Sequence, residues 1–329
     1  LFPHREDFLF GATRGGRGTR PGKLSYAFPY SGHFVMRSAW EQDAVYALLD
    51  SGPFGYGHQH EDKLTFVLYA HGRQLILDPG NYSYDRSKWR RYVLGTHGHN
   101  PILVDGEGQR RRGKSSTYVW PKPWEAPTPV GDDTVWFSDD VADFVRGAYR
   151  DGYGKEGEID VVHTRAMVFI KPTYFIILDT LTPRDGGEHE YTSLFHLDDT
   201  EATLDPNALS ISTGSAGKAN VHLLPARLPG LSARIAKGEE DPVQGWANGP
   251  WRPVPTAVYT FKGKGVSHLA TAVYPTKVDE LCPIEDIRVE PTDGHVKVTV
   301  VFAGGSQDTC RFLNPGNAGQ PYELTRRPN

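Results

Sequence analysis

Cysteine is scarce in this chain, with only Cys282 and Cys310 among its 329 residues. The pair could form one disulfide or stay as two buried thiols, and so few cysteines do not indicate a redox compartment. Neither a Cys-x-x-Cys zinc ribbon nor a glycine-rich phosphate loop is present. Both cysteines lie in the far half of the chain, away from the histidines described below, so a cysteine nucleophile has little support.

Long apolar runs and a strong charge of either sign are also missing. No run approaches the length of a membrane span, and a net charge of −4 does not suggest nucleic acid as a partner. The chain begins at Leu1 without a charged and apolar leader. We therefore expect no membrane span and no signal peptide in it, and we interpret it as a processed chain or a piece of a longer one.

Helical periodicity over many residues is hard to find, whereas 36 glycines, 25 prolines and 12% aromatic residues favour strands and turns. Short apolar runs separated by turn residues predict an all-β fold, a large antiparallel β-sandwich of stacked sheets with few helices. Lys171-Pro172-Thr173 lies between two such runs and predicts a hairpin.

The domain organisation is expected to follow changes in this texture. We expect an irregular lead-in or linker over residues 1–33 and a sandwich that carries the histidines over residues 34–210. A further β-sheet portion, or a second and smaller β-domain, is expected over residues 211–329. Within it, the glycine-rich and proline-rich stretch 237–256 indicates a long surface loop.

The chemistry is densest between residues 57 and 100, where His58 and His60 are followed by Asp78 and by His97 and His99. On a strand, His58 and His60 would point to one face, roughly 6.6 Å apart. Two histidines and a carboxylate with an open position suit zinc or a related divalent ion. The cluster therefore predicts a metal centre or a catalytic imidazole.

The histidines have two other interpretations. Polar residues at strand ends would explain a single histidine, and a hairpin centred on Gly72 would pair Asp78 with about Phe66 rather than with His60. Local geometry alone therefore does not bring the ligands together. A cupin is disfavoured because Leu64 and Thr65 occupy the places where its glutamate would follow the second histidine.

Basic and aromatic residues follow the histidines in two patches, at residues 84–92 and 110–114. Arginine forks bind carboxylate or sulfate groups, and aromatic rings offer flat faces to sugars. The first patch lies between two parts of the histidine cluster and predicts an acidic-polysaccharide site. The predicted substrate-binding residues are Tyr84, Trp89, Arg90 and Arg91. The second patch, Arg110-Arg111-Arg112-Gly113-Lys114, is equally well explained as a solvated charge run.

An ordered set of motifs over residues 28–200 resembles the heparinase II/III-like polysaccharide lyases, a family that includes heparin, heparan sulfate and alginate lyases. The motifs are Phe28-Pro29-Tyr30-Ser31-Gly32-His33-Phe34-Val35-Met36-Arg37-Ser38, Gly57-His58-Gln59-His60-Glu61-Asp62, Leu77-Asp78-Pro79-Gly80, Trp89-Arg90-Arg91-Tyr92 and Gly98-His99-Asn100. The stretches 165–179 and 194–197 are similar to the family's sandwich strands.

The resemblance implies a β-sandwich that normally follows an N-terminal α/α toroid, which we expect to lie outside this chain. It implies a mainly structural divalent metal at His60, Asp78 and His99, and a catalytic His58 in the substrate cleft. Zinc is the expected metal, with manganese or calcium as alternatives, although two histidines argue against calcium. Such lyases cleave uronic-acid chains by β-elimination, and a periplasmic or extracellular location is expected.

Three hypotheses follow from these residues and this resemblance. The first is a polysaccharide lyase acting on an acidic polysaccharide, of which this chain is the metal-binding β-domain and not by itself a complete enzyme. The second is a non-catalytic carbohydrate-binding β-sandwich module with a structural metal. The third is a plain β-sandwich that completes a site on another chain.

Overall fold

The computed structural model describes residues 4–29, 31–52, 54, 58–110, 134–314 and 320–328. Among these residues strands dominate, and the helices are α1 (Glu6–Ala12), α2 (Lys88–Leu94) and the 3-10 helix η1 (Thr96–Gly98). No helix in these ranges has the length and apolar character needed to cross a membrane. The expected all-β fold with few helices is confirmed.

The first layer of the molecule contains two sheets, ordered β1-β2-β3-β4-β5 and β15-β20-β11-β6. A bridge between Ile76 and Leu197 joins them at the ends of β5 and β11. The strands are β1 (Tyr26–Phe28), β2 (His33–Arg37), β3 (Tyr46–Asp50), β4 (Phe66–Ala70), β5 (Arg73–Ile76), β6 (Ile102–Val104), β11 (Glu188–His196), β15 (Ser232–Ala236) and β20 (Thr256–Lys264).

The middle layer is an eight-stranded sheet in the order β12-β13-β14-β21-β10-β9-β8-β7, in which every pairing is antiparallel. Its strands are β7 (Val135–Ser138), β8 (Ala142–Tyr149), β9 (Val161–Ile170), β10 (Tyr174–Pro183), β12 (Ala202–Asp205), β13 (Ser210–Thr213), β14 (Asn220–Pro225) and β21 (Ser267–Thr276). Ile170 pairs with Tyr174 across the predicted turn at Pro172, which confirms that hairpin.

The third layer is the C-terminal sheet, ordered β22-β23-β24-β25. Its strands are β22 (Ile284–Thr292), β23 (His295–Phe302), β24 (Gln307–Leu313) and β25 (Tyr322–Arg327). Four very short strands form two small hairpins beside the first layer, and they are β16 (Glu239–Glu240), β17 (Val243–Gln244), β18 (Trp246–Ala247) and β19 (Arg252–Pro253).

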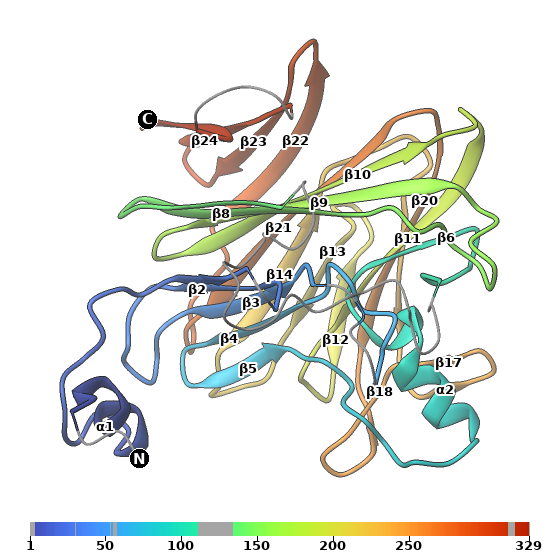
Figure 1. The fold of residues 1–329 in the computed structure, drawn as a ribbon. Helices are drawn as coiled ribbons and strands as arrows, with labels where there is room; N and C mark the ends of the chain where they lie inside the picture. Colours follow the sequence, from blue (N-terminus) through green and yellow to red (C-terminus); the bar gives the residue numbers. More distant parts are fainter. Residues whose placement is uncertain are drawn as a thin grey trace.

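Two apolar cores hold these layers together. Figure 1 shows the C-terminal sheet and the β2–β5 sheet on opposite sides of the strands β8–β10. Because side chains alternate along a strand, β9 directs Met167 and Phe169 into one core and Ala166 and Val168 into the other. Buried on both faces, β9 reads in sequence as a nearly continuous apolar run.

Several features differ from the sequence expectations. The lead-in expected to be irregular contains α1 and β1, and the stretch 237–256 contains β16–β19. The boundary expected after residue 210 falls inside β13, which pairs with β12 on one side and with β14 on the other. One sheet therefore runs across the boundary expected at residue 210. Of the two alternatives left open for the cysteines, the structure has the free thiols, at Cys282 and Cys310.

Candidate functional site

His58 and His60 lie in a loop that precedes β4, not on a strand. The backbone φ of His58 is +55°, in the left-handed region that an extended strand does not use. The loop is held by the last residue of α2 and the segment that follows it, because Glu61 N donates to Leu94 O at 2.8 Å and Thr96 Oγ1 donates to Glu61 O at 2.9 Å. His58 is exposed, whereas His60 is half-buried.

His60 and His99 are brought together as the sequence predicted, with ring centroids 5.3 Å apart. A carboxylate joins them, since ligand atoms of His60, Asp62 and His99 lie within 4.8 Å of one another. Burial raises the pKa of Asp62 to about 6, although His99 acts in the opposite direction. Sequence reasoning left out Asp62, although its position two residues after His60 was a signal for it.

Asp78 reaches this group through His99 and lies outside the set of three. His99 Nδ1 and Asp78 Oδ2 are 2.7 Å apart, and His99 is fully buried. Burial lowers the pKa of His99, but Asp78 and then Asp62 raise it, to about 9. Asp78 lies two residues after the end of β5. The hairpin around Gly72 therefore positions the segment that brings this carboxylate to the buried imidazole.

Asn100 joins the strands that carry the site. Its side-chain Nδ2 donates to Phe66 O at 2.8 Å and to Leu77 O at 2.9 Å, and its Oδ1 accepts from His196 N at 2.8 Å. One buried amide therefore links β4, the end of β5 and β11 directly beside His99. In the sequence, Asn100 is part of a family motif, and its position alone predicted no role for it.

A buried polar group lies behind His99. His196 Nε2 is 3.0 Å from both Tyr92 Oη and Gln244 Nε2, and its Nδ1 is 3.1 Å from Asn100 Oδ1. Burial, and then the nearby His99, lower the pKa of His196 to about 3, so this imidazole stays neutral at physiological pH. Burial also raises the pKa of Tyr92. Neither residue was predicted to contribute to the site.

His58 contacts a predicted substrate-binding residue. Its Nδ1 lies 3.4 Å from Tyr84 Oη, and the two rings meet edge to face with centroids 6.0 Å apart. Arg90 stacks on Tyr84 at 4.9 Å but is only 8% exposed and donates to Asn81 O at 2.6 Å. Arg91 is exposed, and it donates to Arg86 O at 2.8 Å. Arg90 therefore has a structural position, whereas Tyr84 and Arg91 lie at the surface.

Trp89 belongs to a tryptophan cluster with Trp246 and Trp251. Its ring centroid is 4.9 Å from that of Trp246 and 5.6 Å from that of Trp251, and all three rings are half-buried. The hairpin β18–β19 brings the two later tryptophans to the site, because Asn248 N donates to Pro79 O at 3.0 Å. The spacing between residues 89 and 246 gave no signal for this cluster.

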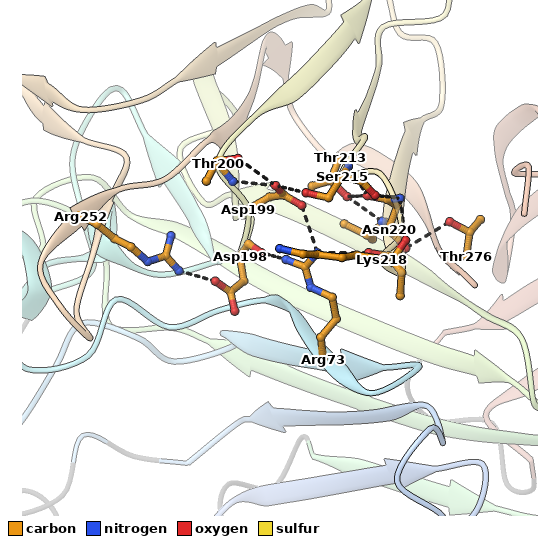
Figure 2. Close-up of polar contacts among 12 residues, drawn as sticks. Arg73, Asp198, Asp199, Thr200, Thr213, Ser215, Lys218, Asn220, Arg252 and Thr276 are labelled. Carbon is orange, nitrogen blue, oxygen red and sulfur yellow. Dashed lines mark hydrogen bonds and ion pairs between the residues drawn. The ribbon is translucent and has the colours of Figure 1, made fainter. Parts of the chain in front are cut away.

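A charged network anchors that hairpin to the sheets (Figure 2). Arg252 at its end pairs with Asp198, whose carbonyl also accepts from Arg73 of β5. Arg73 then bonds Asp199 Oδ2 at 3.3 Å, and Ser215 donates to Asp199 Oδ1 at 2.7 Å. The network therefore links β5, the segment after β11, the segment before β14 and the hairpin that carries Trp246 and Trp251.

The second basic patch is described only at Arg110, whose backbone N–H donates to Tyr149 Oη at 2.7 Å. Arg111, Arg112 and Lys114 lie outside the described residues.

Comparison with known proteins finds relatives for most of the chain. Residues 20–265 match the family model described as "Heparinase II/III-like, C-terminal". The chain is 26% identical over 194 residues to a heparin-sulfate lyase of Bacteroides stercoris, and this alignment covers 57% of the chain and 25% of the relative. A heparin-sulfate lyase of Pedobacter heparinus is 25% identical over 183 residues, covering 54% of the chain and 24% of the relative.

Solved structures share the fold over nearly the whole chain. A heparinase III aligns with a TM-score of 0.76 and 19% identity, over 95% of this chain and 46% of that one. The heparan sulfate lyase HepC from Pedobacter heparinus aligns with a TM-score of 0.74 and 19% identity, over 97% of this chain and 47% of that one. The chain thus spans about a quarter of the curated relatives and under half of the solved structures. With its model matched over residues 20–265, this chain belongs to the heparinase II/III-like family, as a C-terminal β-sandwich domain.

Proposed function

We propose that this chain is the metal-binding β-domain of a polysaccharide lyase that cleaves a uronic-acid-containing polysaccharide by β-elimination. The observation that carries the proposal is the exposed imidazole of His58, in contact with the phenol of Tyr84 and two residues before His60 of the group formed by His60, Asp62 and the buried His99. The family membership and the names of the heparin-sulfate lyase relatives support the substrate class.

The reaction needs three functions from the protein. A base removes the proton at C5 of the uronate, the C4–O4 bond breaks as a C4–C5 double bond forms, and an acid protonates O4 of the leaving group. Imidazole and phenol groups suit such transfers, and neutralising the substrate carboxylate favours loss of the C5 proton. We assign to His58 the contact with the reacting uronate, and Tyr84 lies close enough to orient its ring.

A divalent metal, zinc in our proposal, would be held by His60 and His99 together with the carboxylates of Asp62 and Asp78. Two imidazoles and carboxylate oxygens fit the ligand preferences of zinc. When bound, such an ion would link the loop before β4 to the segments after β5 and before β6. Because ligands bind metal in their deprotonated forms, the imidazoles of His60 and His99 would have to be neutral to hold such an ion.

The sugar-binding surface would be formed by the exposed members of the first basic patch and by the tryptophan cluster. Trp89, Trp246 and Trp251 are half-buried, so their outer edges and faces can contact a sugar ring. Arg91 offers an exposed guanidinium for carboxylate or sulfate groups. Arg90, predicted to bind substrate, would instead hold Tyr84 and Asn81 in place.

The remaining acid or base would come from an N-terminal α/α toroid, and a periplasmic or extracellular location is part of the same proposal. To test it, the purified chain, alone and joined to the segment encoded upstream, is incubated with heparin, heparan sulfate and alginate. Ultraviolet absorbance of the unsaturated uronate product is followed. His58→Ala should abolish the absorbance rise, whereas His4→Ala, at an exposed histidine in the N-terminal segment, should keep it.

An equal rise in the His58→Ala variant would contradict the assigned role of His58. Oligosaccharide binding without any product, in both forms of the protein, would instead favour a carbohydrate-binding module.

A further inference from the structure

A cavity of about 350 Å³ lies on the face of the eight-stranded sheet that is turned away from the candidate site. Its floor is formed by β8, β9, β10 and β21, and Val296 and Phe312 of the C-terminal sheet form one wall. Thr164 and Ala166 of β9 line it, whereas Arg165 between them points to the other face and donates to the Asn100 carbonyl. The sheet therefore separates this cavity from the histidines.

The floor carries a row of hydrogen-bonding side chains set by strand register. Thr180 of β10 pairs with Thr164 of β9 on one side and with His268 of β21 on the other. Thr180 Oγ1 lies 3.0 Å from His268 Nδ1. Hydroxyls and an imidazole in one row, beside the apolar surface of Leu178 and Phe312, match the mixed polar and apolar faces of a sugar ring.

Three arginines give the cavity a positive rim. Arg146, Arg150 and Arg184 line it, and none of its described lining residues is an aspartate or a glutamate. Arg146 Nη1 donates to Leu313 O at 2.7 Å, which fixes that side chain across the gap between the two sheets. Arg184 lies 3.2 Å from Asp160 outside the cavity, where both groups are about half exposed.

We propose that this cavity is a second binding site, separate from the histidine site, for a short anionic segment of a sulfated or carboxylated saccharide. Arginine forks would bind the sulfate or carboxylate groups, and the threonine row would bind sugar hydroxyls. Its volume is at the lower end of the range for small-molecule sites, which suits a short segment rather than a long chain. The choice of a saccharide as the anion rests on the proposed function, whereas the anion site itself does not.

The test is calorimetric titration of the chain with a heparin tetrasaccharide, in a His58→Ala background that prevents turnover. Arg146→Gln/Arg184→Gln should weaken binding at the cavity at least tenfold and leave binding at the histidine site unchanged. The matched control is Arg288→Gln/Arg311→Gln, at arginines of the C-terminal sheet whose side chains are 57% and 43% exposed, and it should bind as the parent does. Because Arg146 also bonds the backbone of Leu313, Thr164→Val/Thr180→Val is measured as a second variant that keeps every charge.

Equal binding by the parent and both cavity variants would overturn the proposal. Equally tight binding of inorganic sulfate, or of a single-stranded DNA of similar charge, would overturn the saccharide assignment. Failure of the proposed lyase function can be distinguished from failure of the cavity proposal, because binding at the cavity can be measured in a chain that shows no lyase activity.

Discussion

Arg165, Asp179 and His163 form a buried charged group on β9 and β10, behind the candidate site. Arg165 Nε lies 2.7 Å from Asp179 Oδ1, His163 Nε2 lies 2.7 Å from the same oxygen, and all three side chains are at most 1% exposed. Arg165 also donates to the carbonyls of Leu64 and Asn100, which flank the histidine segments. This group therefore supports the backbone that positions the site.

Asp179→Asn should reduce the free energy of unfolding by about 3–5 kcal/mol, because it leaves the Arg165 charge buried without its counter-ion. Denaturant unfolding followed by fluorescence measures the effect. Asp160→Asn is the matched control, since its pair with Arg184 is about half exposed and should contribute less than about 1 kcal/mol. Similar losses in the two variants would mean that burial does not strengthen the Asp179 contacts.

Asp179 also predicts a specific acid sensitivity. Burial raises the pKa of Asp179, but Arg165 and His163 lower it by more than that. The resulting pKa is about 2, against an ordinary value of 3.8. A carboxyl with a depressed pKa contributes stability above its unfolded pKa and loses it as the pH falls through its folded pKa. The stability difference between wild type and Asp179→Asn should therefore be constant above about pH 5 and shrink between about pH 4 and 2. A difference that grows over that range would contradict the assignment.

At the scale of elements, α2 carries Trp89 and Tyr92 into the site although it is only seven residues long. Its start depends on Ser87, whose side chain accepts from Arg90 N at 3.1 Å. Ser87→Ala should cost about 1–2 kcal/mol in the local stability of this helix. Hydrogen exchange of peptides that cover residues 88–94 should become faster, because opening of the first turn exposes its amides.

Ser87→Thr is the control for this element, since threonine keeps the capping hydroxyl and should restore slow exchange. If alanine and threonine at this position gave the same exchange rates, the helix would be held by tertiary contacts such as Tyr92 with His196 rather than by its cap.

At the scale of the whole molecule, the proposed metal would join segments from separate parts of the first layer. Removing it with a chelator should lower the melting temperature by several degrees, because a ligand that binds only the folded state stabilises it by mass action. Adding zinc should restore the original value, and elemental analysis should find about one ion per chain before chelation. His60→Ala should show the lower melting temperature from the start and no response to zinc.

Asp62→Asn and Asp78→Asn show, in the same assay, whether each of the two carboxylates is a metal ligand. The proposed four-ligand set predicts metal loss in both variants. Full metal content in Asp78→Asn with loss in Asp62→Asn would reduce Asp78 to a residue that orients His99, a contact whose loss typically weakens metal binding by about 10–100-fold.

The fold class could be predicted from the sequence because it depends on local properties. The apolar runs of β9 and β10 and the turn at Pro172 between them specify strands and a hairpin without reference to the rest of the chain. The site could be predicted only in part. His60 and His99 were expected to meet and do, but Asp62, Asn100 and His196 acquire their places through contacts across the first layer.

What the sequence alone determined is the all-β fold class, the hairpin at Pro172 and the pair of histidines at the centre of the site. These follow from side-chain alternation, turn residues and ligand chemistry, all of which act over a few residues. Only the tertiary structure decided that Trp246 and Trp251 join Trp89, that Arg90 is buried, and that a positive cavity lies behind the sheet. Those facts depend on which strands become neighbours, and pairing between distant segments leaves no periodic signal in the chain.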